Sequence, residues 1–148
     1  MNRSTLDTAF LVIGKQKESA RRNVMTSSLL QPYVTLQELE RDCANGLEEI
    51  LESTIEQSVR YAISVAVYMQ ALTGGLEKAD ELAEANKARK QTHDATMDSI
   101  NALSRALKQL GQSNQWIGSI AGNRAAYGKF ALLLAFEKMS RYEQEAIC

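Results

Sequence analysis

The segment from Val59 to Leu72 is the most continuously apolar part of the chain, with a single charged residue and a Thr-Gly-Gly turn signal directly after it. Large and small side chains alternate along it, which is the pattern of a strand. We nevertheless interpret it as a helix, because no glycine or proline separates it from the strongly helical stretch before it and no second strand exists to pair with it. Its small residues Ser58, Ala62 and Ala66 then share one face and allow a neighbouring helix to approach closely.

The composition of the whole chain also favours helix. Ala, Leu, Glu, Gln, Lys and Arg dominate, and the 148 residues include one proline. A hydrophobic content of 45% and a charged content of 24% are typical of a folded domain rather than a disordered chain. We therefore expect a single all-α domain over residues 1–148.

Apolar periodicity and punctuation together predict four helices, over about residues 4–28, 35–73, 76–110 and 123–146. The second helix has the clearest start, because Thr35 can cap it while Glu38 reaches back to the cap. Asn45-Gly46 is a point where this helix can break or kink, since glycine costs about 1 kcal/mol relative to alanine there. We expect residues 111–123 to be irregular, with Trp116 filling the end of the domain.

These helices predict an antiparallel four-helix bundle with a long central helical hairpin. The segment Val59 to Leu72 and the last helix are apolar around most of their circumference, which is more than a surface helix of one monomer needs. We therefore expect self-association as a two-fold homodimer. The first half of the third helix is thinly apolar by comparison, so the hairpin should have a buried base and an exposed or partner-covered tip.

Charge and cysteine content restrict the partners and the compartment. With 17 basic and 18 acidic residues, the chain does not have the charge of a nucleic-acid or membrane-surface binder. We interpret its local basic patch as a solvated helix face; the patch comprises Lys15, Lys17, Arg21 and Arg22. Two cysteines without metal-ligand spacing, and no segment near the roughly 20 apolar residues of a membrane span, indicate a cytoplasmic protein with free thiols.

Motifs of catalysis are scarce. The single histidine, His93, excludes sites that need several histidine ligands, and the chain has no phosphate-binding loop or nucleophile elbow. We interpret His93 as a histidine at the edge of the core, because Met97 and Ile100 continue its helix face. The alternative is a catalytic role as a general base or ligand, including a nucleophile pair with Cys43.

One group of acids has metal-binding chemistry, and it comprises Glu49, Glu52, Glu56, Asp94 and Asp98. In an antiparallel hairpin centred on Gly74-Gly75, residues whose numbers sum to about 149 lie at the same level. The acids would then lie near one another and could bind Mg²⁺ through carboxylate oxygens. A solvated acidic face is the simpler interpretation, so we expect no cofactor and assign Mg²⁺ to the alternative.

Glu49 and Glu52 also belong to a sequence pattern that resembles that of a known family. The ExxE of Glu49-Ile50-Leu51-Glu52, with an ExxD on the next helix at Glu77-Lys78-Ala79-Asp80, resembles the pattern of the all-α nucleoside triphosphate pyrophosphohydrolases. This resemblance implies a Mg²⁺-dependent nucleotide hydrolase. The geometry argues against it, because Glu77 lies beside the turn, roughly 35 Å from Glu49 at the rise of a helix.

A second resemblance lies in the third helix. The pattern HDAxxxxINxLxR, from His93 to Arg105, resembles helices of small uncharacterised bacterial and phage proteins, which implies a helical fold and no particular activity. Asn101, Arg105 and Trp116 are candidates for contact with another protein. We therefore favour a non-enzymatic helical interaction or regulatory protein, of the kind of a phage or mobile-element accessory factor, which acts by binding another macromolecule. The nucleotide hydrolase remains the alternative.

Overall fold

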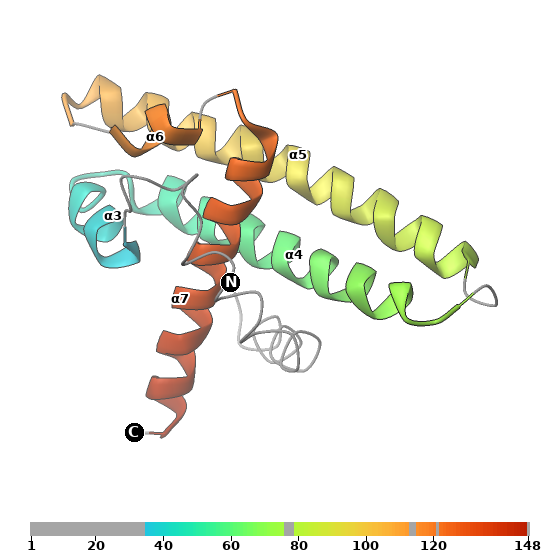
Figure 1. Cartoon of the computed structure of the whole chain (residues 1–148). Helices are drawn as coiled ribbons and strands as arrows, with labels where there is room; N and C mark the ends of the chain where they lie inside the picture. Colours follow the sequence, from blue (N-terminus) through green and yellow to red (C-terminus); the bar gives the residue numbers. More distant parts are fainter. Residues whose placement is uncertain (1–34, 76–78, 113–114, 121, 148) are drawn as a thin grey trace.

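The computed structural model describes residues 35–75, 79–112, 115–120 and 122–147, and all regular structure in these residues is α-helical. The helices are α3 (Leu36–Asp42), α4 (Glu48–Leu72), α5 (Ala79–Gln109), α6 (Gln115–Ile120) and α7 (Arg124–Ile147), as Figure 1 shows. The all-α class is confirmed, and the segment from Val59 to Leu72 is helix rather than strand. The helix predicted over residues 4–28 lies outside the described residues. Among the helices described, none combines the length and the hydropathy that crossing a bilayer requires.

The prediction of one helix over residues 35–73 is wrong, because the chain breaks between α3 and α4. Gly46 has a φ of 107°, a backbone conformation that residues other than glycine rarely adopt. The Cys43 carbonyl accepts a hydrogen bond from the Leu47 N–H at 3.1 Å, so the break is a compact turn. The Asn45-Gly46 signal in the sequence marks this turn. The irregular segment predicted over residues 111–123 is also partly wrong, since it contains the short helix α6.

The start of α3 is capped as the sequence predicted. The Thr35 hydroxyl oxygen accepts a hydrogen bond from the backbone N–H three residues later at 3.1 Å. A second donor of this first turn, the Leu36 N–H, is satisfied by the Glu137 carboxylate of α7 at 2.5 Å. Arg141 of α7 pairs with Glu40 of α3 at 2.7 Å. Charged contacts therefore hold α3 against α7.

The helices α4 and α5 lie side by side and antiparallel, and they form a long hairpin that projects from the rest of the molecule (Figure 1). The helix α7 does not run along this hairpin but crosses it between its middle and its base, in contact with both α4 and α5. The small residues Ser58, Ala62 and Ala66 of α4 are all buried, as their shared face predicted. The last helix is thus a packing partner of α4, which was also expected.

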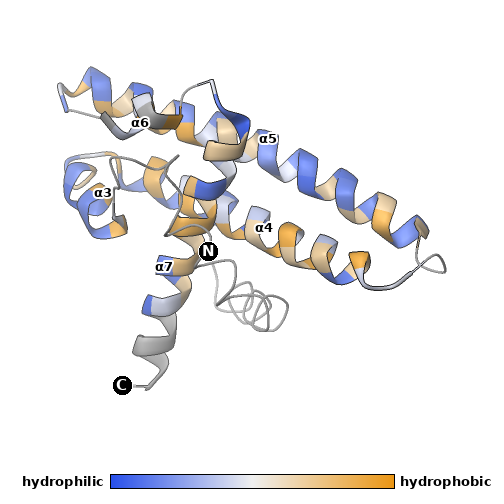
Figure 2. Cartoon of the chain, in the orientation of Figure 1, coloured by the Kyte–Doolittle hydropathy of each residue, from blue (hydrophilic) through white to orange (hydrophobic). Residues whose placement is uncertain are grey.

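The core lies where α7 covers the hairpin, and its fully buried members include Val59, Ile100, Leu103, Leu107, Leu134 and Met139. Past Ala66 no residue of α4 is buried, and between residues 79 and 92 of α5 only Ala85 is buried. We call Val67–Leu72 together with Ala79–Lys90 the hairpin tip, and the remainder of α4 and α5 the hairpin base. Figure 2 shows that hydrophobic residues continue along α4 into the tip. The predicted contrast between a buried base and an exposed tip is confirmed within the chain.

The register of the hairpin differs from the predicted one by about one helical turn. The Thr54 hydroxyl donates to the Ser99 carbonyl at 3.4 Å, and the Thr96 hydroxyl donates to the Gln57 carbonyl at 3.3 Å. Each pair has residue numbers that sum to 153, not to the predicted value of about 149. The centre of the hairpin lies later in the chain than predicted, since α5 begins at Ala79.

Candidate functional site

The five acids considered as a Mg²⁺ site do not converge. Glu52 and Glu56 are half-buried, and the exposed members are Glu49, Asp94 and Asp98. Glu56 pairs with Arg60 at 3.3 Å on its own helix, and Asp94 pairs with Arg124 of α7. Within the described part of the chain, no three His, Cys, Asp or Glu side chains are grouped so that they could hold a metal ion. The shifted register also places Glu56 opposite Met97 rather than opposite His93.

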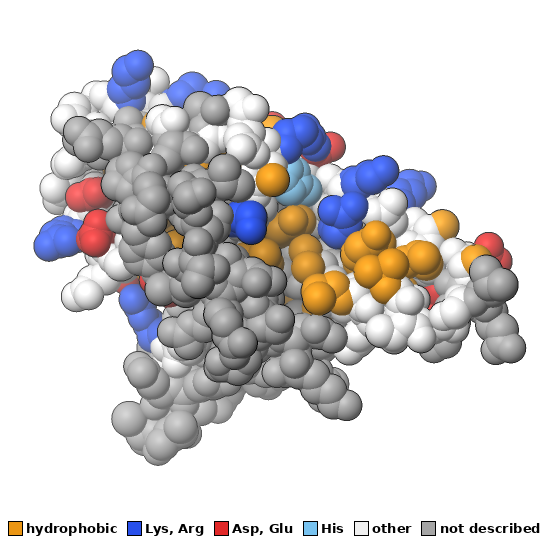
Figure 3. Space-filling view, in the orientation of Figure 1, with side chains coloured by type: hydrophobic (Ala, Val, Ile, Leu, Met, Phe, Trp, Pro, Cys, Tyr) orange, Lys and Arg blue, Asp and Glu red, His pale blue; other side chains and the backbone are white. Residues whose placement is uncertain are grey.

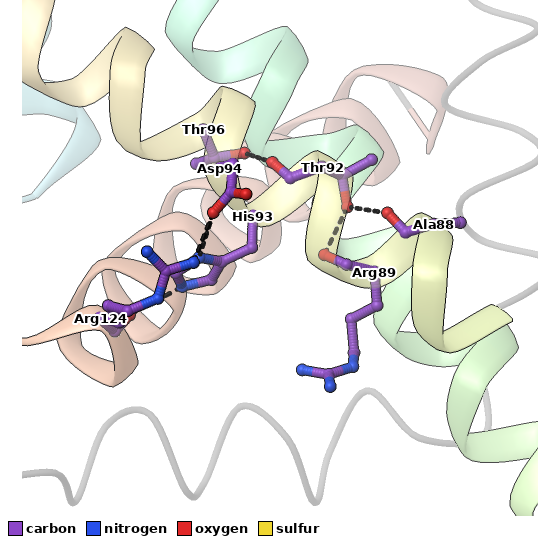
Figure 4. A network of polar contacts seen from close by, with 7 residues as sticks. All are labelled: Ala88, Arg89, Thr92, His93, Asp94, Thr96 and Arg124. Carbon is purple, nitrogen blue, oxygen red and sulfur yellow. Dashed lines mark hydrogen bonds and ion pairs between the residues drawn. The ribbon is translucent and has the colours of Figure 1, made fainter. Parts of the chain in front are cut away.

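His93 lies at the edge of the core, where its helix face predicted it. Its residue surface is 9% exposed, and its Nε2 lies 2.7 Å from the Arg124 carbonyl oxygen. Because a carbonyl oxygen only accepts, Nε2 carries the hydrogen in this bond. The ring also meets the Tyr61 ring edge-on, with 5.4 Å between centroids. Figure 4 shows His93 and Arg124 lying together, so His93 ties the middle of α5 to the first residue of α7.

Cys43 is part of the core at the end of α3, together with Leu36 and Leu39. Burial, with smaller contributions from Asp42 and Glu48, raises the pKa of Cys43 from 9.0 to about 11. The thiol is therefore protonated at neutral pH, and a protonated thiol is a poor nucleophile. Core packing is the role that these surroundings support.

Two of the three predicted interaction residues make internal contacts. The Asn101 side-chain oxygen accepts a hydrogen bond from the Tyr127 hydroxyl at 2.7 Å. Trp116 is buried and stacks on Phe130, with 4.9 Å between ring centroids. Arg105 is the exposed member of the three. The predicted basic patch of Lys15, Lys17, Arg21 and Arg22 lies outside the described residues.

A pocket of about 550 Å³ opens where α4, α5 and α7 meet. Its described lining residues are Tyr61 of α4, Arg89, Lys90, His93 and Asp94 of α5, and Arg124, Ala125, Gly128, Lys129 and Leu132 of α7. Four of these side chains are cationic and one is anionic, in a chain whose formal net charge is −1. Positive charge is therefore concentrated at this pocket, which we call the basic pocket.

Arg89 is the most restrained cation of the basic pocket. Its guanidinium carbon lies 4.8 Å from the centroid of the Tyr68 ring, and its Nη2 donates to the Asn86 side-chain oxygen at 2.7 Å. Its Nε is buried and has no hydrogen-bond partner among the described residues. Burial raises the pKa of the Tyr61 phenol, and the neighbouring Arg89 guanidinium opposes that rise. Packing thus fixes Arg89 while one of its donors stays unused.

Gly128 allows α7 to approach the other two helices closely. A Cβ atom at this position would lie 2.8 Å from the Tyr61 hydroxyl oxygen and 3.4 Å from the His93 ring. The first of these distances is shorter than a carbon side chain tolerates, so a larger residue would displace Tyr61 or α7. The pocket was not predicted from the sequence. The available signals were Arg89 and His93 one turn apart, and a glycine inside an apolar helix.

The hairpin tip is the second candidate site. Val67 is 41% exposed and Leu72 is 53% exposed, although both belong to the most apolar segment of the chain. Figure 3 shows a patch of hydrophobic side chains on this part of the molecule, with positive side chains beside it. The charged residues exposed on the α5 side are Asp80, Glu81, Glu84, Lys87 and Lys90. Exposed apolar patches with a polar rim are typical of protein contact sites.

Comparison with known proteins does not place this chain in a family. No protein-family model, no curated protein and no solved structure matches it. The hairpin tip and the basic pocket are therefore the two features that bear on function.

Proposed function

We propose that this protein is a non-enzymatic helical interaction protein that acts by binding another protein through the hairpin tip. The supporting observation is the segment from Val67 to Leu72, in which every residue except Gln70 is apolar and none is buried. Covering apolar surface releases about 25 cal/mol for each Å² removed from water, so this segment favours association. A second helix laid along the tip would cover it in the manner of helix-to-helix recognition.

The partner we propose first is a second copy of the chain. Along the α5 side of the tip, the acidic residues Asp80 and Glu84 precede the basic residues Lys87 and Lys90. Like charges three or four residues apart on a helix repel one another, so each group is unfavourable in an isolated helix. In an antiparallel two-fold dimer with its axis near Ala85, the acids of one copy face the bases of the other.

This dimer also gives the predicted four-helix bundle a specific form. Two hairpin tips packed in antiparallel fashion bring together four helices, two from each copy. The surplus of apolar surface noted between Val59 and Leu72 is then covered between copies rather than within one. A regulatory role follows from the same surface, because any other protein that covers the tip competes with self-association.

The test is the mass of the protein in solution, measured by light scattering during size-exclusion chromatography. We expect the wild-type chain to have twice the monomer mass. The double substitution Val67→Lys/Leu72→Lys should yield a folded monomer, because it puts charge into the covered surface. Ile50→Lys/Leu110→Lys is the matched control, since these residues are also exposed hydrophobics but lie at the end of the hairpin away from the tip. Wild-type protein that stays monomeric at every soluble concentration would contradict the dimer.

The charge arrangement is tested separately by sedimentation equilibrium. Lys87→Glu should weaken the dimer, because it places an acid against the acids of the other copy. Combining it with Glu84→Lys should restore part of the affinity, since the two charges are exchanged. Equal weakening by the single and the combined substitutions would show that these charges do not face one another.

A further inference from the structure

We infer that the basic pocket binds the phosphate group of a small organic phosphate. This site adjoins the hairpin tip, since Arg89 and Lys90 belong to both, but the inference does not rest on the dimer. Phosphate carries two negative charges at neutral pH and several acceptor oxygens, which suits a pocket of clustered cations.

The charge balance of the pocket favours an anion. Its one lining carboxylate, Asp94, is already paired with Arg124. The remaining cations, Arg89, Lys90 and Lys129, have no carboxylate partner among the described residues. Three unneutralised cations around one cavity repel one another, and a dianion placed among them offsets that repulsion.

Arg89 provides the most specific element of recognition. The stack on Tyr68 and the bond to Asn86 hold its guanidinium in place before any ligand arrives. A buried donor without an acceptor costs about 1–3 kcal/mol, and the Nε of Arg89 is such a donor among the described residues. The planar guanidinium of Arg89, which lines the pocket, matches the geometry of a phosphate group.

The start of α7 adds to the attraction. Arg124 and Ala125 lie in the first turn of this 24-residue helix and both line the pocket. The N-terminus of a long helix carries a partial positive charge and free backbone N–H groups, which together favour anions. The Asn123 side-chain oxygen accepts a hydrogen bond from the Ala126 N–H at 3.2 Å. The N–H groups of Arg124 and Ala125 have no such bond among the described residues.

The size and walls of the pocket favour an organic ester over free phosphate. A cavity of about 550 Å³ falls in the range of small-molecule sites, and inorganic phosphate alone would fill little of it. Leu132 and the Tyr61 ring provide apolar wall for the organic part. Gly128 leaves part of the pocket unfilled, because a larger residue there would occupy the space beside Tyr61.

The test is isothermal titration of the full chain with inorganic phosphate, ribose 5-phosphate and adenosine monophosphate, at constant ionic strength set with potassium chloride. We expect saturable binding of at least one ester, weaker binding of inorganic phosphate and none of adenosine, which lacks the phosphate. If inorganic phosphate binds as tightly as both esters, the site takes phosphate but not an organic part. Absence of saturable binding by all three phosphates would overturn the inference.

Substitutions then test whether the residues of the basic pocket bind the phosphate. Arg89→Gln/Lys129→Gln should weaken binding about tenfold or more, because it removes two charge-assisted bonds. The matched control is Arg105→Gln/Lys108→Gln, which removes two cations from a shallow site elsewhere on α5 and should leave the affinity unchanged. Equal weakening in both variants would mean nonspecific attraction and would overturn the site.

Two further variants separate binding from folding and from self-association. Lys90→Gln/Lys129→Gln leaves Arg89 and its packing in place, so it should weaken binding without loss of helical circular dichroism. Val67→Lys/Leu72→Lys alters the hairpin tip alone and should bind the phosphate ester as the wild-type chain does. Loss of binding in this last variant would show that the site needs the dimer and would contradict the separation made here.

Discussion

The base and the tip of the α4–α5 hairpin are parts of the same two helices, but among the described helices the others cover only the base. At the base, Ile100, Leu103 and Leu107 follow one face of α5 and are all completely buried. At the tip, Leu72 of the more apolar helix α4 is 53% exposed. Hydrophobicity therefore does not decide which part is buried in this chain. The position at which α7 crosses the hairpin decides it.

This difference separates stability from recognition. The base gains its stability from tertiary packing, since residues from α3, α4, α5, α6 and α7 form one core there. The tip depends on the bonds within each helix and on a sequence rich in Ala, Glu and Lys, which form helices readily. Substitutions at the base should therefore change the free energy of unfolding, whereas substitutions at the tip should change association.

The largest effect should come from truncating the core that α7 forms with the base. Phe130→Ala should lower the free energy of unfolding by about 3–5 kcal/mol, because it leaves a cavity under Trp116. Leu72→Ala at the tip should change it by no more than about 0.5 kcal/mol at concentrations where any dimer has dissociated. Urea unfolding followed by circular dichroism measures both. Similar losses at the two sites would show that the tip contributes as much to stability as the core.

The turn between α3 and α4 directly precedes the base, and its stability should depend on the backbone conformation of Gly46. Gly46→Ala should cost about 1–2 kcal/mol, because alanine is strained at a positive φ and the packed helices on either side prevent relaxation. No neighbouring atom would contact the new Cβ, so the loss reports backbone strain alone. The neighbouring Asn45→Ala is the control and should stay within about 0.5 kcal/mol of the wild-type chain. Thermal unfolding of the pair measures the difference.

Two threonines allow a smaller comparison of the same kind. Thr35→Ala removes the cap of α3 and should cost about 1 kcal/mol. Thr73 ends α4 at the tip, where its hydroxyl donates to the Gln70 carbonyl at 2.7 Å and is exposed to solvent. Thr73→Ala should therefore have a smaller effect than Thr35→Ala. The reverse order in urea unfolding would show that the tip contributes more to stability than its exposure indicates.

A last difference, which is absent at neutral pH, is a dependence of stability on pH beside the base. The pKa of Cys43 rises from 9.0 to about 11 on folding, so the unfolded chain releases the thiol proton first. The contribution of the neutral thiol is fully present below pH 9.0 and is lost as the pH rises toward about 11. The difference in free energy of unfolding between wild type and Cys43→Ala should shift over this window. A tip variant such as Val67→Ala should show no corresponding shift.

Local chemistry made parts of this fold predictable. The Thr35 cap, the glycine turn at Gly46 and the helical state of Val59 to Leu72 depend on residues within a few turns of each other. The burial of Trp116 agrees with its predicted place at the end of the domain, although Trp116 was also a candidate for contact with another protein. Signals of this kind are properties of short segments, so one sequence is enough to find them.

The arrangement of the helices was harder to predict. The register of the hairpin depends on where α5 resumes after the turn, and an error of four residues moved Glu56 away from His93. The basic pocket needs Tyr61, Arg89 and Lys129 from three helices, which no spacing in the sequence relates. The acids considered for Mg²⁺ had suitable spacing on each helix, but the described residues do not group them as a metal site, and two of them pair with Arg60 and Arg124 instead.

The crossing of α7 has a mechanical consequence. Because α7 packs against the hairpin base and not against the tip, a sideways force on the tip is resisted where the contacts with α7 begin. The basic pocket lies at this point, since His93 and Arg124 join α5 to α7 there. A force applied to the tip would therefore act most strongly on the contacts around this pocket.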